Sequence, residues 1–175
     1  MQYEENGIQG WMTLTELQWL FDMAQKMESI VEIGSWKGRS THALCSGCPG
    51  TVTAVDHFRG SASDFNGHWE ARAKDLSLVF INNVGFFPNL ELLKMESVEA
   101  AKLFPDKSVE MVFIDGDHSA ESIMEDISSW KRKCKKLICG HDINYGPTQL
   151  ALYEMKMRYS IPSGTEIWYS EIKGD

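Results

Sequence analysis

The sequence predicts an α/β fold in which a doubly wound, mostly parallel sheet carries helices on both faces. Short apolar or β-branched runs alternate along the chain with segments whose apolar residues follow helical spacing. The run at 109–114 contains almost no polar residue, which is typical of a parallel strand buried on both faces. The chain has 175 residues, so a single domain can bury a sizeable core.

The first half of the chain begins with a helix directly after Thr13, because Thr13 and Glu16 have the spacing of a capping box. Apolar residues at helical spacing from Leu17 to Met27 are expected to cover one face of the sheet. The next elements, in order, are a strand at 30–33, a short helix ending near 45, a strand at 51–55, a polar loop at 57–67 and a helix whose face includes Trp69, Ala73, Leu76, Phe80 and Val84.

The second half continues the alternation and ends in a strand expected to be antiparallel at the sheet edge. In order, its elements are a strand at 90–95, a short helix ending near 104, a strand at 109–114, a helix capped by Ser119, a strand at 137–139, a helix at 148–157 and the edge strand at 166–172. We therefore expect one domain with an N-terminal helical segment (1–28), a core (29–145) and a C-terminal helix and edge strand (146–175).

The charge balance argues against nucleic acid as a partner, because the net charge is -8 and phosphate binding needs a basic face. The one basic run, Lys131 to Lys136, is interpreted as a solvated helix end that complements the helix dipole. No apolar run is long enough to span a membrane, and the acidic N-terminus lacks a signal-peptide pattern. We expect a cytoplasmic protein.

Four cysteines raise the question of a zinc or redox site, because Cys45 and Cys48 are separated by two residues. A redox pair of this spacing would open a helix, whereas this pair falls near a helix end. Cys134 and Cys139 are separated by four residues, and Cys139 lies inside an apolar strand run. Reduced, structural thiols are therefore the favoured interpretation.

The turn after the first strand has the form of a βα turn that holds a small anionic or nucleotide-like ligand. Gly34 and Gly38 frame this turn, and glycine lets the backbone approach a ligand closely. Ser40 and Thr41 add hydroxyl and N–H groups at a helix start, which suits a carboxylate or a phosphate.

Two further residues indicate which nucleotide-like ligand the turn suits. Trp36 stands where the dinucleotide fingerprint has its second glycine, so a pyrophosphate such as that of NAD or FAD is disfavoured. Asp56 lies 22 positions after Gly34, at the end of the second strand. A carboxylate at that place can accept both hydroxyl groups of a ribose.

Polar or glycine residues follow five of the predicted strands, namely Gly34, Asp56, Glu96, Asp115 and Asp142. Because ligands of parallel α/β sheets bind outside the carboxyl ends of the strands, these residues predict one site at that edge. Glu32 is an acid inside the first strand run, and a buried carboxylate costs several kcal/mol unless it is paired. It is expected to accept bonds from an ammonium group, directly or through water.

Three stretches resemble one known family. Residues 31–41, which contain Glu32, Gly34 and Gly38, resemble motif I (E-x-G-x-x-x-G) of class I S-adenosylmethionine-dependent methyltransferases. Together with residues 112–119 (V-F-I-D-G-D-H-S) and Gly140-His-Asp142, they resemble the small-molecule O-methyltransferase branch, including macrolide-sugar, catechol-type and cephalosporin-hydroxylase-like relatives. The resemblance covers roughly residues 29 to 145 and implies a Rossmann-like fold.

The resemblance implies roles for individual residues. The methionine end of the cofactor is expected at Glu32, Gly34, Ser35 and Gly38, with its carboxylate near Ser40 or Thr41. The adenosyl end is expected at Asp56 for the ribose, with His57 beside it, and at Glu96 and Ser97 for the adenine. Asp115 is expected next to the amino group of the cofactor or next to a metal.

Asp115 and Asp142 would end adjacent strands, where two converging carboxylates can hold a Mg²⁺-like ion. His141-Asp142 stands where catechol-type relatives have an Asp-Asn pair, and an imidazole ligand would favour the softer ions Mn, Fe or Zn.

His118 and His141 are the best candidates for a general base, while His42, His57 and His68 have weaker claims. Backbone bonding or helix capping is the structural alternative for His118 and His141.

The expected function is transfer of the methyl group of S-adenosylmethionine to an oxygen of a small-molecule acceptor. The acceptor site would be built from the N-terminal segment, the loop 57–68 and the stretch 143–147, with completion by a partner subunit of a homo-oligomer left open. Two alternatives stay open as well: a nucleotide-cofactor protein of another reaction class, and a non-catalytic protein with a methyltransferase-like fold.

Overall fold

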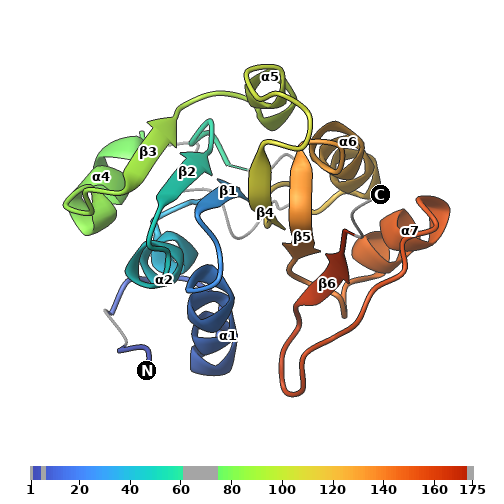
Figure 1. Ribbon diagram of the computed structural model, residues 1–175, viewed down its shortest axis with the longest axis horizontal. Helices are drawn as coiled ribbons and strands as arrows, with labels where there is room; N and C mark the ends of the chain where they lie inside the picture. The colour runs from blue at the N-terminus through green and yellow to red at the C-terminus, as the bar shows by residue number, and fades with distance from the viewer. Residues whose placement is uncertain (1, 5–6, 61–74, 173–175) are drawn as a thin grey trace.

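The computed structural model describes residues 2–4, 7–60 and 75–172, and a mixed sheet lies at its centre (Figure 1). Within these residues the sheet has six strands in the order β3-β2-β1-β4-β5-β6. They are β1 (Ser29–Ile33), β2 (Thr51–Val55), β3 (Leu90–Leu93), β4 (Val109–Ile114), β5 (Cys134–Gly140) and β6 (Trp168–Glu171). Only β6 is antiparallel, to β5. The predicted fold class, including its antiparallel edge strand, is confirmed.

The helices follow the expected alternation with small shifts at their ends. They are α1 (Leu14–Ala24), α2 (Arg39–Gly47), α4 (Ser77–Val84), α5 (Ser97–Ala101), α6 (Ala120–Trp130) and α7 (Gly146–Glu154). Of the helix face expected from Trp69 onward, Trp69 and Ala73 lie outside the described residues, as does most of the predicted loop at 57–67. Within the described ranges, no helix combines the length and the apolar character that crossing a bilayer requires.

Alternating side chains of the central strands supply two separate cores. Ile30 and Phe113 pack with α1 and α2 on one face of the sheet. Val31 and Val112, their neighbours in the chain, pack with α5, α6 and α7 on the other face. Figure 1 shows these two helical layers on either side of the strands. Each fully buried aliphatic or aromatic side chain stabilises the fold by about 1.5–3 kcal/mol.

The basic run 131–136 is divided between two elements, which differs from the expected helix end. Helix α6 ends at Trp130 with Lys131 as its C-cap, and β5 already begins at Cys134. Cys134 and Leu137 are buried, while Lys135 and Lys136 stay exposed between them. The strand forms because Cys134 pairs in register with Val109 of β4, and the Lys136 Nζ atom lies 2.9 Å from a carboxylate oxygen of Glu110.

The four cysteines are free and buried. Burial raises the pKa of the Cys45 and Cys48 thiols. Because zinc binding and redox exchange both use the thiolate, this environment disfavours either role and favours a structural one.

The strand order reverses between β1 and β4, and a close backbone contact marks that point. The chain leaves β1 toward β2 on one side, while β4 and β5 continue on the other. Gly34 has a φ of 83°, and a Cβ atom placed on it would lie 2.0 Å from the carbonyl oxygen of Asp115. Only glycine therefore allows the two strand ends to meet at the edge where ligands of such sheets bind.

Replacing Gly34 with Ala should lower the free energy of unfolding by about 3 kcal/mol or more, since it combines a backbone clash with a positive φ. Gly146→Ala is the matched control, because a Cβ atom at Gly146 meets nothing within 4 Å. Urea denaturation of both variants measures the difference. Equal stabilities of the two variants would contradict the proposed backbone constraint.

Candidate functional site

A cavity of about 710 Å³ opens at the carboxyl edge of the sheet. This volume is in the range of small-molecule and cofactor sites. All five residues that the sequence placed after strands line it, namely Gly34, Asp56, Glu96, Asp115 and Asp142. So do Ser35, Ser40, His57, Ser97, His118 and His141. The structure thus gathers these predicted site residues around one space.

Asp56 stabilises the turn that follows β1 through hydrogen bonds. One of its carboxylate oxygens accepts a hydrogen bond of 2.8 Å from the backbone N–H of Trp36, and the other accepts one of 2.6 Å from Phe58. The turn ends at Gly38, which adopts a φ of 92° as the N-cap of α2. Asp56 therefore both lines the cavity and fixes the backbone of the glycine-bearing turn.

Glu32, Thr41 and Gly38 lie behind the cavity wall rather than among its lining residues. The Thr41 hydroxyl donates to one carboxylate oxygen of Glu32, and the other oxygen, Oε1, is buried with no hydrogen-bond partner among the described residues. Burial raises the pKa of Glu32 to about 7. A buried acceptor of this kind is suited to a donor such as a water molecule or an ammonium group beyond the turn.

The opposite end of the cavity carries Glu96 and Ser97, which begin α5. Glu96 forms an ion pair with Arg59, and its other carboxylate oxygen lies 3.8 Å from the Nε2 atom of His57. The Ser97 hydroxyl accepts a hydrogen bond of 2.8 Å from the indole N–H of Trp130. These contacts join the ends of β2 and β3 to helix α6.

The N-terminal segment forms a further wall. The Arg39 side chain of α2 donates hydrogen bonds to the carbonyl oxygens of Ile8, at 2.7 Å, and Met12, at 3.0 Å. Between them, the Trp11 ring packs against the Trp36 ring in a tilted arrangement, with ring centroids 4.3 Å apart, and Trp11 stays 62% exposed. Ile8 belongs to the core, while Trp11 lines the cavity.

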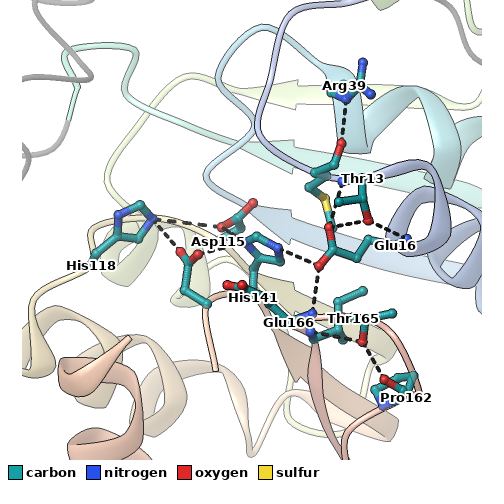
Figure 2. A network of polar contacts seen from close by, with 12 residues as sticks. Thr13, Glu16, Arg39, Asp115, His118, His141, Pro162, Thr165 and Glu166 are labelled. Carbon is teal, nitrogen blue, oxygen red and sulfur yellow. Dashed lines mark hydrogen bonds and ion pairs between the residues drawn. The ribbon is translucent and has the colours of Figure 1, made fainter. Parts of the chain in front are cut away.

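A chain of acids and imidazoles crosses the floor of the site (Figure 2). The Nε2 atom of His118 lies 3.1 Å from Asp142 and 4.0 Å from Asp115. The Nδ1 atom of His141 lies 3.1 Å from Asp142 and 3.7 Å from Asp115. The Nε2 atom of His141 faces the carboxylate of Glu16 at 3.2 Å.

Glu16 ties this chain to the rest of the fold. Its Oε1 atom also accepts a hydrogen bond of 2.7 Å from the backbone N–H of Glu166, ahead of β6. Its Oε2 atom accepts from the backbone N–H of Thr13 at 2.7 Å, so the predicted capping box is present. One buried carboxylate thus joins the start of α1, the end of β5 and the segment before β6, as Figure 2 shows.

The charges of this network shift several pKa values. Burial alone would lower the pKa of His141, but the charge of Asp115 and the hydrogen bonds to Asp142 and Glu16 raise it to about 11. Burial would raise the pKa of Glu16, but the bonds from His141 and from the backbone lower it to about 2. Burial raises the pKa of Asp115 to about 6, against the opposing charge of His141. His141 is therefore held as a cation between carboxylates.

Three donors of this chain converge on a point that could hold a cation. One ligand atom each from Asp115, His118 and Asp142 lies within 4.8 Å of the others, and all three residues are partly exposed to the cavity. Two carboxylates and an imidazole fit a divalent ion of the Mg, Mn or Fe class. The structure groups His118 in this cluster, while both ring nitrogens of the predicted ligand His141 face Asp142 and Glu16.

Two residues of the candidate site were not identified from the sequence. Glu16 was interpreted only as part of a capping box, and nothing in its local pattern reveals His141, which lies 125 positions away. Asp126, a buried acid of α6, lines the cavity too. A sequence signal existed for it, because Ser119, Ser122 and Asp126 recur at helical spacing on one face of α6.

Comparisons with known proteins identify the family and the fold of the chain. A family model described as a methyltransferase domain matches residues 31–143, from β1 to just beyond β5. No curated protein matches the chain.

Solved structures with the same fold include several methyltransferases. An O-methyltransferase from Bacillus cereus in complex with S-adenosylhomocysteine has a TM-score of 0.62 and 14% identity, covering 97% of this chain and 84% of that one. An S-adenosylhomocysteine-bound methyltransferase from Podospora anserina has a TM-score of 0.63 and 11% identity, covering 91% and 78%. A TDP-rhamnose 3'-O-methyltransferase of calicheamicin biosynthesis has a TM-score of 0.61 and 11% identity, covering 90% and 77%.

Replacing Glu16 with Gln should lower the free energy of unfolding by about 3 kcal/mol, because the buried His141 imidazolium loses the charged partner of its Nε2 atom. Since the folded pKa of His141 is raised from 6.5 to about 11, its contribution is complete below pH 6.5 and declines toward pH 11. The wild-type protein should therefore lose more stability than Glu16→Gln between about pH 6 and about pH 9. Urea denaturation at both pH values measures this.

Glu99→Gln provides the control for that substitution, since Glu99 pairs with Lys102 on an exposed helix surface. This variant should keep nearly the stability of the wild type, because exposed ion pairs contribute little. Parallel pH profiles for Glu16→Gln and the wild type would show that His141 is not held as a cation by Glu16.

Proposed function

The chain belongs to the methyltransferase domain family, and on this basis we propose that it transfers the methyl group of S-adenosylmethionine to an oxygen of a small-molecule acceptor. The family match confirms the resemblance found in the sequence motifs. The observation that carries the proposal is the convergence of five strand-end residues on one cavity at the point where the strand order reverses. Such a place in an α/β sheet is where nucleotide-like ligands bind.

The donor would lie along the ends of β1, β2 and β4. Asp56 would accept the ribose hydroxyls, and the turn from Gly34 to Gly38 would hold the methionine end, with Ser40 near its carboxylate. Support comes from two neighbouring structures that contain S-adenosylhomocysteine. The bulky Trp36 at the position of the second dinucleotide glycine disfavours NAD.

Acceptor activation is assigned to the cluster of Asp115, His118 and Asp142. We propose that these three residues hold a divalent cation, which when bound supplies a Lewis acid that polarises the acceptor hydroxyl. His141, held cationic by Glu16, offsets the negative charge of Asp115 and Asp142 and keeps their side chains oriented. Without a cation, His118 is the general-base candidate, because its ring is 30% exposed and bonded to Asp142.

The acceptor itself is proposed to be a small molecule bound beside Trp11, Asn144 and Tyr145, which line the open side of the cavity. An oxygen acceptor is supported by the neighbouring sugar 3'-O-methyltransferase. Catalysis then consists of placing the acceptor oxygen in line with the sulfonium methyl and removing its proton. We also propose that a second subunit completes this side of the cavity. A cytoplasmic location is proposed as well, because four free thiols suit a reducing compartment.

Calorimetric titration with S-adenosylmethionine and with NAD tests the donor. The wild type should bind S-adenosylmethionine and should not bind NAD. Asp56→Asn should weaken S-adenosylmethionine binding by about tenfold or more, because a charge-assisted hydrogen bond to the ribose is lost. Absence of S-adenosylmethionine binding would exclude the proposed function. Binding of the donor without turnover on a broad acceptor panel would favour the non-catalytic alternative.

Titration with Mn²⁺, read by calorimetry, tests the cation site. Asp142→Asn should weaken Mn²⁺ binding by about tenfold or more, because one carboxylate ligand is lost. Asn tolerates the φ of 59° at this position, so the backbone is preserved. Asp117→Asn, in the same loop and the same cavity, should keep wild-type affinity. If Mn²⁺ fails to bind, His118 acts as a metal-free base instead.

A further inference from the structure

Helix α6 places a buried acid, Asp126, in the wall of the cavity, near Ser97, which follows β3, and Gly116, which follows β4. The Asp126 side chain is only 6% exposed, yet it lines the cavity together with Ser122, one helical turn before it. The apolar residues of the same helix, Ile123, Ile127 and Trp130, pack in the core. Asp126 therefore lies where the helix meets the cavity rather than on the solvent side.

The surroundings of Asp126 leave its charge uncompensated. The Ser97 hydroxyl accepts from the indole N–H of Trp130, so its own hydrogen is available to Asp126, with which it forms a hydrogen bond. The charged neighbours that act on Asp126 are all acids, namely Glu125, Asp117 and Glu96. Burial raises the pKa of Asp126 to about 6. A buried carboxyl group in acidic surroundings is costly unless a donor satisfies it.

Gly116 leaves Asp126 open to the cavity. A Cβ atom added to Gly116 would lie 3.6 Å from the Oδ2 atom of Asp126. A side chain at this position would therefore contact the carboxyl group of Asp126. The carboxyl group is therefore presented to whatever occupies the space between Gly116 and Ser97.

The proposed function places one part of the cofactor there. With the ribose at Asp56 and the methionine end at the turn after β1, the base extends toward Glu96, Ser97 and Gly116. Adenine carries an exocyclic amino donor next to its N1 acceptor. A carboxyl group accepts from the amino group, and in its protonated form it can also donate to N1.

We propose that Asp126 recognises the amino edge of the adenine of S-adenosylmethionine and thereby sets the base specificity of the site. This inference rests on the proposed function. Ser97, which also lines the cavity, orients the carboxyl group, and Trp130, which does not line the cavity, orients Ser97. A purely structural Asp126 would affect the binding of every ligand base equally.

Calorimetric titration with S-adenosylhomocysteine and with S-inosylhomocysteine tests this recognition. Inosine replaces the amino donor with a carbonyl acceptor and the N1 acceptor with an N–H donor. The wild type should bind S-adenosylhomocysteine at least about tenfold more tightly than S-inosylhomocysteine, as expected for one charge-assisted hydrogen bond. Asp126→Asn should reduce that ratio by about tenfold or more, because the Asn amide can donate to the inosine carbonyl oxygen, which an ionised carboxylate repels.

Glu121→Gln is the matched control, as it removes an exposed acid of the same helix that does not line the cavity. This variant should keep the wild-type ratio. An unchanged ratio in Asp126→Asn, with S-adenosylhomocysteine still bound, would overturn the inference and leave the proposed function intact. Failure of the wild type to bind S-adenosylhomocysteine would overturn both.

The wild-type protein alone provides a second test that does not depend on the folding of Asp126→Asn. N6,N6-dimethyl-S-adenosylhomocysteine has no amino hydrogen, so the wild type should bind it at least about tenfold more weakly than S-adenosylhomocysteine. Equal affinity for both compounds would overturn the inference.

Discussion

The buried ion pair between Glu16 and His141 is the interaction on which the candidate site depends. Asp115 and Asp142 lie side by side at the ends of adjacent strands, where their like charges repel. The Nδ1 atom of the His141 cation lies within 3.7 Å of both carboxylates, and its Nε2 atom pairs with Glu16. Removing one partner of such a buried network leaves a charge without compensation, which is why it is costly.

This network also connects the site to the architecture. Glu16 belongs to the first turn of α1, His141 follows β5, and Glu166 precedes the antiparallel edge strand β6. The carboxylate of Glu16 therefore connects the first helix and the segment before the last strand to His141 at the centre of the site. On the other side, Gly34 allows the ends of β1 and β4 to approach, and Asp56 holds the turn over them. The cavity lies between the Glu16 network and the turn held by Asp56.

Periodic patterns predicted most of the fold, because strand and helix periods are local properties. The strands at 51–55 and 109–114 agree residue by residue with β2 and β4, and the capping box at Thr13 and Glu16 is present. The start of β5 was missed, because a run of lysines resembles a helix end and only pairing with β4 makes it a strand. The tendency of ligands to bind at strand ends correctly predicted that Asp56 and Glu96 would line one cavity.

Long-range partners were beyond the reach of the sequence. The bond between Glu16 and His141 spans 125 positions, and no local pattern encodes it. Local patterns therefore treated His118 and His141 alike. Both line the cavity, but the His141 side chain is 8% exposed and enclosed between carboxylates, whereas the His118 side chain is 30% exposed. Asp126 was missed for a related reason, because its significance depends on Ser97 and Gly116 from two other parts of the chain.

A crystal structure with S-adenosylhomocysteine and Mn²⁺ would show whether the cavity holds both the cofactor and the ion. We expect the ribose on Asp56, the methionine end at the turn from Gly34 to Gly38, and the ion on Asp115, His118 and Asp142. The anomalous signal of manganese identifies the ion without reference to the protein. An empty cavity at saturating S-adenosylhomocysteine, or an ion bound elsewhere while the three donors stay free, would contradict this expectation.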